Sequence, residues 1–328
     1  MTTRNSGAGP IRTLVIGVPI KDEPLAQLRV TFPEITFIHA PFEEMDAHLP
    51  VADAIVAWHI TSDQVAAAPR LRWLQSFAAG VDKMPFADLT ARSILITNAS
   101  GVHAANIAEH ILALMLAFAR GLPWLIRTPA KGDWFELPVR DRIFELGEQR
   151  LLVVGLGDIG LALAQRAKGL GMEVVGVRRR TDLPIPESVP EVYGVDQLAE
   201  VLPTADHVAI CLPLTPATHG LFDATMLARM KPSAYIYNVG RGPIIDTAAL
   251  ITALEAGSIA GAGLDVTDPE PLPADSPLWA IENVIVTAHT SGSTPRYWDR
   301  IIKILEMNIS RFQNGEPLLN QVDPEARY

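Results

Sequence analysis

The stretch Val153-Val154-Gly155-Leu156-Gly157-Asp158-Ile159-Gly160 decides the fold of this chain. The apolar run 151–154 predicts a buried strand, and residues 161–170 are helix formers with one apolar face. The first glycine permits a tight turn, the second lets a pyrophosphate approach the backbone, and the third lets the helix pack close to the strand. We therefore predict a dinucleotide site that includes Gly155, Gly157, Asp158, Ile159 and Gly160, although such a turn also occurs in other α/β proteins.

The bulk composition limits the classes of protein that the chain can belong to. With 328 residues it is long for one hydrophobic core, so we expect two domains. It is 48% hydrophobic and 20% charged, which is typical of a folded globular protein. A formal net charge of −10 argues against nucleic acid as the main partner. The most apolar segment, 107–119, is interrupted by Glu109 and His110 and is too short for a membrane span.

The N-terminus and the cysteine count predict the compartment. Residues 1–10 are polar and glycine-rich and lack the apolar core of a signal peptide. The chain has a single cysteine, Cys211, which excludes an intrachain disulfide framework and suits a reducing compartment. We therefore expect a cytoplasmic protein with no membrane partner, and we expect no metal site.

The first hundred residues alternate short β-rich runs with segments of helical spacing. Strands are predicted at 14–18, 36–40, 54–58, 73–77 and 94–97, with helices such as 23–31 and 61–68 between them. This alternation predicts a parallel sheet covered by helices, with ligands at the carboxyl ends of the strands. The loop Ala78-Ala79-Gly80-Val81-Asp82 follows one such end, where small residues leave backbone N–H groups free to meet an anion. A plain strand–helix turn is the alternative.

A long helix is predicted over 104–120, with an apolar stripe made of Ile107, Ile111, Leu114, Met115 and Phe118. We expect it to continue past Pro123 into Trp124, Leu125 and Ile126. This apolar excess predicts contact with another subunit, and a helix buried between domains is the alternative. Residues 128–147, which include Trp134 and Phe135, are interpreted as an arm.

A second domain is predicted from residue 149 to about 290, with strands at 151–154, 173–177, 207–211, 235–238, 263–266 and 284–287. A final helix over 296–314, with Ile301, Ile304, Leu305, Met307 and Ile309 as its apolar stripe, should return to the first domain. The predicted fold is α/β, with two Rossmann- or flavodoxin-like doubly wound parallel-sheet domains separated by a cleft. Residues 1–103 and 292–328 would bind substrate, and residues 104–291 would bind the dinucleotide.

Three predicted strand ends of the second domain carry polar groups, in the segments 238–242, 263–272 and 287–292. An arginine, a carboxylate and a histidine beside a nicotinamide would suit hydride transfer to a 2-keto acid. The planar fork of arginine can grip the substrate carboxylate and carbonyl, and histidine can protonate the developing alkoxide. A glutamate would orient the histidine ring and favour its charged form. Alternatively, Arg241 is a surface charge and Glu270 a turn residue.

At this point the chain resembles the D-isomer-specific 2-hydroxyacid dehydrogenase family. The resemblance rests on 79–82, Ala108-Glu109-His110, the glycine motif, 238–242, 264–272, and His289 with Ser291-Gly292. It implies that Arg241 binds and polarises substrate, Glu270 supports the histidine and His289 is the acid/base. Asp265 would face the nicotinamide carboxamide, and Ala79, Gly80 and Val81 would cradle the substrate carboxylate. The further cofactor residues that it implies are Leu212, Pro213, Thr218, Val239, Gly240 and Ser291. The resemblance also implies a homodimer formed through the cofactor domains.

The chain departs from the common pattern of that family at two places. Ala288 stands where many members have proline. At 178–180 three arginines follow the second strand, where NAD-specific members tend to place an acidic residue for the ribose 2′-OH. Because arginine binds a phosphate bidentately, we predict a preference for NADP(H) over NAD(H), with Arg178 and Arg179 as contacts. A solvated arginine run is the alternative.

The predicted activity is an NADP-preferring reductase of small 2-keto acids in the D series. Glyoxylate and hydroxypyruvate are the leading candidate substrates, because residues 308–322 resemble the glyoxylate/hydroxypyruvate reductase branch of the family. Two alternatives stay open: an enzyme that oxidises phosphite or formate, and a nucleotide-sensing protein like the corepressors that resemble this family. His103, at the domain join, is a candidate contact of cofactor or substrate, whereas we interpret His110 as a packing residue. His39, His48, His207 and His219 are interpreted as structural.

Overall fold

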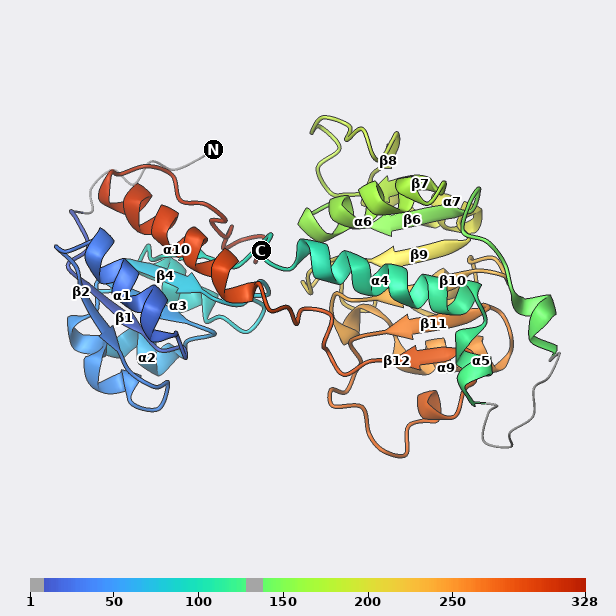
Figure 1. Ribbon diagram of the computed structural model, residues 1–328, viewed down its shortest axis with the longest axis horizontal. Helices are drawn as coiled ribbons and strands as arrows, with labels where there is room; N and C mark the ends of the chain where they lie inside the picture. Colours follow the sequence, from blue (N-terminus) through green and yellow to red (C-terminus); the bar gives the residue numbers. More distant parts are fainter. Residues whose placement is uncertain (1–8, 128–137) are drawn as a thin grey trace. The chain divides into compact units, whose positions relative to one another are not determined.

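The computed structural model of the chain describes residues 9–127 and 138–328 (Figure 1). The chain divides into two units, Met1–Val102 with Pro295–Tyr328, and His103–Thr294. Each unit contains one wholly parallel sheet with helices packed against it, so the predicted doubly wound α/β fold is confirmed for both. No helix in the described part of the chain is long and apolar enough to cross a membrane.

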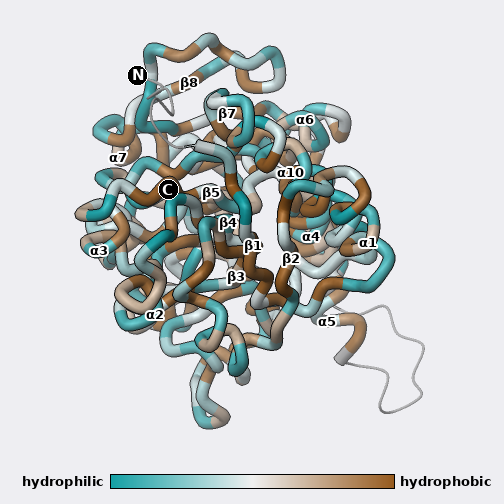
Figure 2. The backbone as a smooth tube through the Cα atoms, turned by 90° about the vertical axis from the view of Figure 1, so that its left-hand side faces the viewer, coloured by the Kyte–Doolittle hydropathy of each residue, from teal (hydrophilic) through white to brown (hydrophobic). Residues whose placement is uncertain are grey.

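The first unit contains a five-stranded sheet in the order β2-β1-β3-β4-β5. This order is that of the flavodoxin-like fold. The strands are β1 (Thr13–Ile16), β2 (Thr36–His39), β3 (Ala54–Ala57), β4 (Trp73–Ser76) and β5 (Leu95–Thr97). Between them lie α1 (Asp22–Thr31), η1 (Met45–Val51), α2 (Ser62–Ala67) and α3 (Phe86–Ala91). Most of β1 and β3 is brown in Figure 2, because most of their residues are hydrophobic. Both strands are almost wholly buried.

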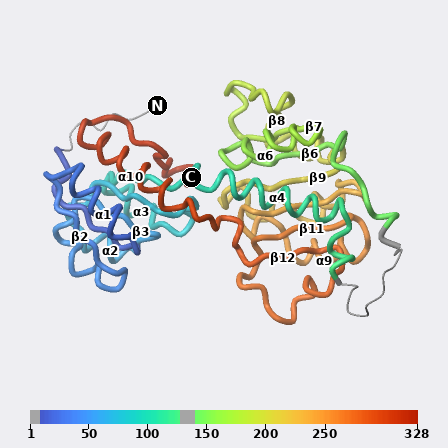
Figure 3. The backbone as a smooth tube through the Cα atoms, in the orientation of Figure 1, coloured from blue at the N-terminus to red at the C-terminus, as the bar shows by residue number. Residues whose placement is uncertain are grey.

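Helix α10 (Tyr297–Gln313) returns to the first unit, as predicted. Its red tube lies among the blue elements of the N-terminal half in Figure 3, where Ile301, Leu305 and Ile309 pack into the same core as Leu14. The predicted apolar stripe was wrong at Met307, which is 46% exposed. Helical geometry places positions 302, 308 and 312 on the buried face instead.

Asn308 is a polar residue on the buried face of α10, and its amide is satisfied inside the first unit. It donates to Gln75 Oε1 over 3.0 Å and accepts from the backbone N–H of Leu319 over 2.7 Å. Gln75, wholly buried on β4, also accepts from Thr97 and donates to the carbonyl of Asn98. Since buried polar groups are costly unless paired, this network fixes α10 and the C-terminal segment onto the sheet.

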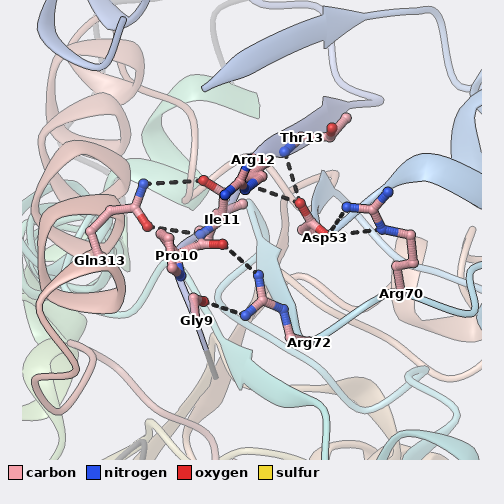
Figure 4. Close-up of polar contacts among 9 residues, drawn as sticks. All are labelled: Gly9, Pro10, Ile11, Arg12, Thr13, Asp53, Arg70, Arg72 and Gln313. Carbon is pink, nitrogen blue, oxygen red and sulfur yellow. Dashed lines mark hydrogen bonds and ion pairs between the residues drawn. The ribbon is translucent and has the colours of Figure 1, made fainter. Parts of the chain in front are cut away.

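A second polar cluster ties the start of the chain to the first sheet (Figure 4). Asp53 accepts from the backbone N–H groups of Arg12 at 2.9 Å and Thr13 at 3.0 Å, and it pairs with Arg70 at 2.9 Å. Burial alone would raise the pKa of Asp53, but these backbone hydrogen bonds and the Arg70 guanidinium outweigh it and lower the pKa. Gln313 at the end of α10 exchanges two hydrogen bonds with the backbone of Ile11.

The second unit contains a seven-stranded sheet in the order β12-β11-β10-β9-β6-β7-β8. Its strands are β6 (Arg150–Val154), β7 (Glu173–Val177), β8 (Glu191–Tyr193), β9 (His207–Ile210), β10 (Tyr235–Asn238), β11 (Gly261–Leu264) and β12 (Val284–Val286). The strand β8 was not predicted, and β11 lies two residues earlier than expected. This is the Rossmann order, and its direction reverses between β6 and β9, where ligands of such sheets bind.

Helices cover both faces of the second sheet. They are α4 (Ala104–Ala119), α5 (Leu122–Arg127), α6 (Asp158–Gly169), α7 (Leu198–Val201), α8 (Ala224–Leu227) and α9 (Thr247–Glu255), with the 3-10 helices η3 (Pro138–Arg142), η4 (Val195–Gln197), η5 (Leu202–Thr204), η6 (Gly242–Ile244) and η7 (Pro277–Trp279). Alternate residues of β6 enter opposite cores: Leu151 and Val153 pack with α4 and α6, whereas Leu152 and Val154 pack with α7 and α9.

The predicted stripe of α4 is buried throughout, from Ile107 to Phe118. The prediction that this helix continues past Pro123 was wrong. The helix ends at Ala119, and Gly121 adopts a φ of +66°, a left-handed conformation that closes a helix without the steric cost borne by other residues. Residues 122–127 form the separate helix α5.

Candidate active site

The glycine turn after β6 has the geometry that a dinucleotide requires. Gly155 has a φ of +107°, and a Cβ there would lie 2.6 Å from the carbonyl oxygen of Cys211. A Cβ on Gly160 would lie 2.0 Å from the carbonyl oxygen of Gly155, so only glycine lets α6 pack this closely. Around Gly157, in contrast, a Cβ would meet nothing within 4 Å. Because α6 begins at Asp158, its first backbone N–H groups face this open position, which suits a pyrophosphate.

The other predicted cofactor residues follow the carboxyl ends of neighbouring strands of the same sheet. After β9, the Thr218 hydroxyl donates to the carbonyl of Pro213 over 2.7 Å and accepts from the N–H of Thr215 over 2.8 Å. The loop that contains Leu212 is therefore held in a fixed shape beside the glycine turn. Val239 and Gly240 follow β10 and are buried. All these residues follow the carboxyl ends of strands on the side of the sheet order that runs from β9 to β10, next to the glycine turn after β6.

The arginine run begins directly after β7. Arg178 is half-buried, and its guanidinium donates to the backbone carbonyls of Leu183 and Pro184. Arg179 and Arg180 are exposed. The first position after β7 is thus an arginine and not a carboxylate.

The structure brings Glu270 and His289 together. The Nδ1 atom of His289 lies 2.6 Å from Glu270 Oε1, and the two side chains are 46% and 42% exposed. Since a carboxylate only accepts, Nδ1 is the protonated nitrogen of this contact, and Nε2 is left as the atom that can exchange a proton with substrate. His289 also has a φ of +52°, which is uncommon for a residue with a Cβ and common at functional sites.

Arg241 follows β10, two strands from β12, so neighbouring strand spacings place the two strand ends on the order of 10 Å apart. Asn238 braces the turn, because its amide donates to the carbonyl of Arg241 over 2.9 Å and accepts from the N–H of Gly240 over 3.0 Å. The loops after β10 and β11 are in close contact, since a Cβ on Gly242 would lie 1.9 Å from the carbonyl oxygen of Thr267.

Asp265, predicted to face the nicotinamide carboxamide, is buried and organises the loop after β12. Its carboxylate accepts from the Thr287 hydroxyl at 2.6 Å, the N–H of Thr290 at 2.9 Å and the N–H of Ser291 at 3.0 Å. Burial alone would raise the pKa of Asp265, but the hydrogen bonds from Ser291 and Thr287 outweigh it and lower the pKa. The carboxylate therefore stays ionised and shapes the loop that carries His289.

Two residues on α4 that we had not assigned to the site contact this loop. His110 Nε2 lies 3.0 Å from the Thr287 hydroxyl, and Asn106 Nδ2 donates to the carbonyl of Ser291 over 2.7 Å. His110, which we interpreted as a packing residue, therefore also forms a hydrogen bond to this loop. Their spacing of four residues places both on one helix face, which is the signal in the sequence that could have found them. His103, the first residue before α4, lies beside Gly292.

In the first unit, the predicted carboxylate cradle follows the carboxyl end of β4. Ala79 and Gly80 are half-buried, Val81 is buried, and their three backbone N–H groups have no acceptor among the residues that the structure describes. The loop is fixed by neighbours instead: Asn98 Nδ2 donates to the carbonyl of Ala79 over 2.9 Å. Such a loop can present backbone donors to an anion.

Aromatic side chains that we had not predicted surround this loop in the first unit. The Trp58 ring, exposed after β3, stacks on Tyr297 with centroids 5.9 Å apart. The Tyr297 hydroxyl donates to the carbonyl of Phe77 over 2.7 Å, directly before the cradle, and burial raises the pKa of this hydroxyl well above its usual value. These rings come from distant parts of the sequence, so spacing alone does not reveal them. Trp134 and Phe135, by contrast, lie outside the described residues.

The chain is similar to known proteins over most of its length. Residues 112–291, more than half of the chain, match the family model described as D-isomer specific 2-hydroxyacid dehydrogenase, NAD binding domain. A glyoxylate reductase from Korarchaeum cryptofilum is 34% identical over 274 residues, which are 81% of this chain and 80% of that protein. A glyoxylate/hydroxypyruvate reductase B from Citrobacter koseri is 38% identical over 260 residues, which are 79% and 80% of the two chains.

The fold is also shared with solved structures. A D-isomer specific 2-hydroxyacid dehydrogenase from Xanthobacter autotrophicus Py2, in complex with NADPH and MES, superposes with a TM-score of 0.84 at 32% identity. The match covers 97% of this chain and 100% of that one. The chain therefore belongs to the D-isomer specific 2-hydroxyacid dehydrogenases, a family of NAD(P)-dependent oxidoreductases.

Proposed function

We propose that the protein is an NADPH-preferring reductase that converts small 2-keto acids to D-2-hydroxy acids. Glyoxylate and hydroxypyruvate are the leading candidate substrates. The observation that carries the proposal is the contact of 2.6 Å between His289 Nδ1 and Glu270 Oε1 at the edge that also holds the glycine turn. The substrate class is supported by the relatives named glyoxylate reductase and glyoxylate/hydroxypyruvate reductase B.

The residues of the chain would divide the chemistry as follows. Arg241 would grip the carboxylate and the carbonyl oxygen of the substrate, and the backbone N–H groups of Gly80 and Val81 would bind the carboxylate. Glu270 would hold the His289 ring so that Nε2 donates its proton to the oxygen that becomes the hydroxyl. NADPH, when bound, supplies the hydride for the carbonyl carbon. Loss of either His289 or Arg241 should lower turnover by about two to four orders of magnitude.

The test of this function is a substrate panel with purified protein. Glyoxylate, hydroxypyruvate and bulkier 2-keto acids would be offered with NADPH, and phosphite and formate with NADP⁺. We expect NADPH oxidation with the small keto acids. Turnover with phosphite or formate alone would indicate an enzyme that oxidises small anions. Cofactor binding without any turnover would indicate a nucleotide-sensing protein.

The cofactor preference is proposed to depend on Arg178 and Arg179. Both follow β7 where a ribose-binding carboxylate would stand, and the similar protein from Xanthobacter autotrophicus was solved with NADPH. The ratio of kcat/KM with NADPH to that with NADH should exceed one in the parent and fall in Arg178→Ala and Arg179→Ala. Arg180→Ala, an exposed member of the same run, is the matched control and should keep the parent ratio. A parent that prefers NADH would refute the assignment.

A homodimer through the second unit is also proposed. The outer faces of α4 and α5 expose Leu116 at 41% and Ile126 at 72%, together with Leu122 and Leu125. Several exposed large apolar side chains on two helices that contact each other suit an interaction surface. Light scattering should give twice the chain mass for the parent and the single chain mass for a Leu116→Glu/Ile126→Glu variant. A monomeric parent would contradict the proposal.

We also propose a cytoplasmic location for the protein. The chain has a single cysteine, Cys211, and so cannot form an intrachain disulfide, which suits a reducing compartment. Fractionation of the source cells should recover the activity in the cytosolic extract, and recovery in a membrane or secreted fraction would overturn the placement.

A further inference from the structure

Two side chains one helical turn apart on α4 contact the loop that carries His289. Asn106 donates to the carbonyl of Ser291, and His110 contacts the Thr287 hydroxyl. We propose that Asn106 and His110 are positioning residues, which hold this loop in the shape that the acid/base reaction needs without touching substrate. The proposal rests on the proposed role of His289.

The direction of the hydrogen bonds between α4 and Asp265 follows from the donors present. The Thr287 hydroxyl has one proton, and it lies 2.6 Å from Asp265 Oδ1, an ionised oxygen that only accepts. Thr287 therefore donates to Asp265, and its oxygen accepts from His110 Nε2–H at 3.0 Å. His110 Nε2 itself is 3.7 Å from Asp265 Oδ1, so its polar N–H also faces the carboxylate. The result is a relay from α4 through Thr287 to Asp265.

This relay acts on the backbone on both sides of His289. Asp265 accepts from the N–H groups of Thr290 and Ser291 through its side chain, and from the N–H of His289 through its carbonyl at 2.9 Å. The backbone of His289 has a positive φ, a conformation that persists only when its surroundings impose it. Asn106 holds the far end of the same loop through the Ser291 carbonyl. Loss of the hydrogen bonds from Asn106 and His110 should therefore let the loop relax, and the His289 imidazole would then be misplaced.

A packing role alone does not account for these residues. An apolar side chain at either position would fill similar space, but it would leave the Thr287 oxygen and the Ser291 carbonyl each without the donor that the structure gives them. Both donors are supplied by α4, and both acceptors lie in the loop after β12. These two hydrogen bonds therefore hold the loop that carries His289.

The test compares substitutions that keep or remove the donor. His110→Gln retains an N–H near the position of Nε2, whereas His110→Leu removes it at similar volume. Thr287→Val removes only the relay hydroxyl and serves if His110→Leu does not fold. Glu109→Gln is the control for a change on the same helix, because Glu109 points to solvent toward Arg166.

Three measurements are made: kcat and KM with glyoxylate, NADPH affinity, and hydrogen exchange of the segment 287–292. In His110→Leu and Thr287→Val we expect kcat to fall about 10- to 100-fold, as for a misplaced catalytic group, with a smaller fold-change in NADPH affinity because the glycine turn after β6 is unaltered. Exchange of the Thr290 and Ser291 amides should be about tenfold faster, as expected for a weakened hydrogen bond. His110→Gln and Glu109→Gln should behave as the parent.

Two results would overturn the inference: unchanged kcat and exchange in both donor-free variants, or equal losses in His110→Gln and His110→Leu. Failure of the proposed function is distinguishable, because a parent without keto acid turnover would refute that function. The exchange measurement would still decide whether α4 holds the loop.

Discussion

Alanine substitution should affect different properties at two glycines of the glycine turn after β6, namely cofactor binding at Gly157 and stability at Gly160. At Gly160 the new methyl group would lie 2.0 Å from the carbonyl oxygen of Gly155 and 3.0 Å from Val153 Cγ1. Ordinary contact needs more than 3 Å, so α6 must move by roughly 1 Å or more, and such overpacking costs about 1–3 kcal/mol. At Gly157 the methyl group meets nothing within 4 Å, so the fold has no reason to change.

Cofactor binding should separate the variants further, because we propose Gly157 as the position where a pyrophosphate approaches the backbone. In Gly157→Ala we expect an unchanged Tm and an NADPH Kd raised about 10- to 100-fold, which corresponds to ~1.4–2.8 kcal/mol. In Gly160→Ala the Tm should fall by about 2–4 °C for each kcal/mol of overpacking. Thermal unfolding and NADPH fluorescence titration measure the two effects. Parent-like NADPH binding by Gly157→Ala would refute the assignment of the turn to the dinucleotide.

Further predictions concern pH and specificity. Burial lowers the pKa of His207 to about 4, so the unfolded chain takes up a proton below about pH 6.5 that the folded chain does not, and stability should fall by up to about 3 kcal/mol from pH 6.5 to 4. In urea unfolding, His207→Gln should flatten this dependence, and an equally steep curve would contradict it. The lowered pKa of Asp53 stabilises the fold above the pKa of the unfolded carboxyl, near 4, and this stabilisation is lost as the pH falls through the lower folded value. Asp53→Asn should therefore be destabilised most at neutral pH, and an equal loss at pH 3 would sink the argument. Because the Trp58 ring stands beside the cradle, Trp58→Ala should change the relative kcat/KM of bulky and small keto acids, and an unaltered ranking would remove this residue from the substrate site.

The sequence predicted the sheets well because their signals are local. Apolar runs such as 151–154 are short, buried and bounded by turn residues, so strand type follows from pattern. Helix bounds were less accurate where the pattern ran on: the apolar residues after Gly121 belong to a second helix, since a glycine with positive φ ends the first. Met307 was misplaced because apolar residues also occur on exposed helix faces.

The candidate site was predictable where chemistry is carried by a motif. Glu270 and His289 are only nineteen residues apart and follow adjacent strands of the sheet, and the structure gives them a contact of 2.6 Å. The supporting contacts were not predictable in the same way. His110 and Thr287 are 177 residues apart, and their hydrogen bond depends on how α4 packs on the sheet. Long-range packing of this kind leaves little trace in a single sequence.

The most direct test of the account is NADPH oxidation with glyoxylate and hydroxypyruvate by the parent and by His289→Ala, alongside NADPH titration of both. The account predicts turnover by the parent, a loss of at least about 100-fold in kcat for the variant, and similar NADPH affinity in the two. A parent that turns over neither acid, or a variant that reduces them at the parent rate, would contradict the central claim that His289 delivers the proton in a 2-keto acid reduction.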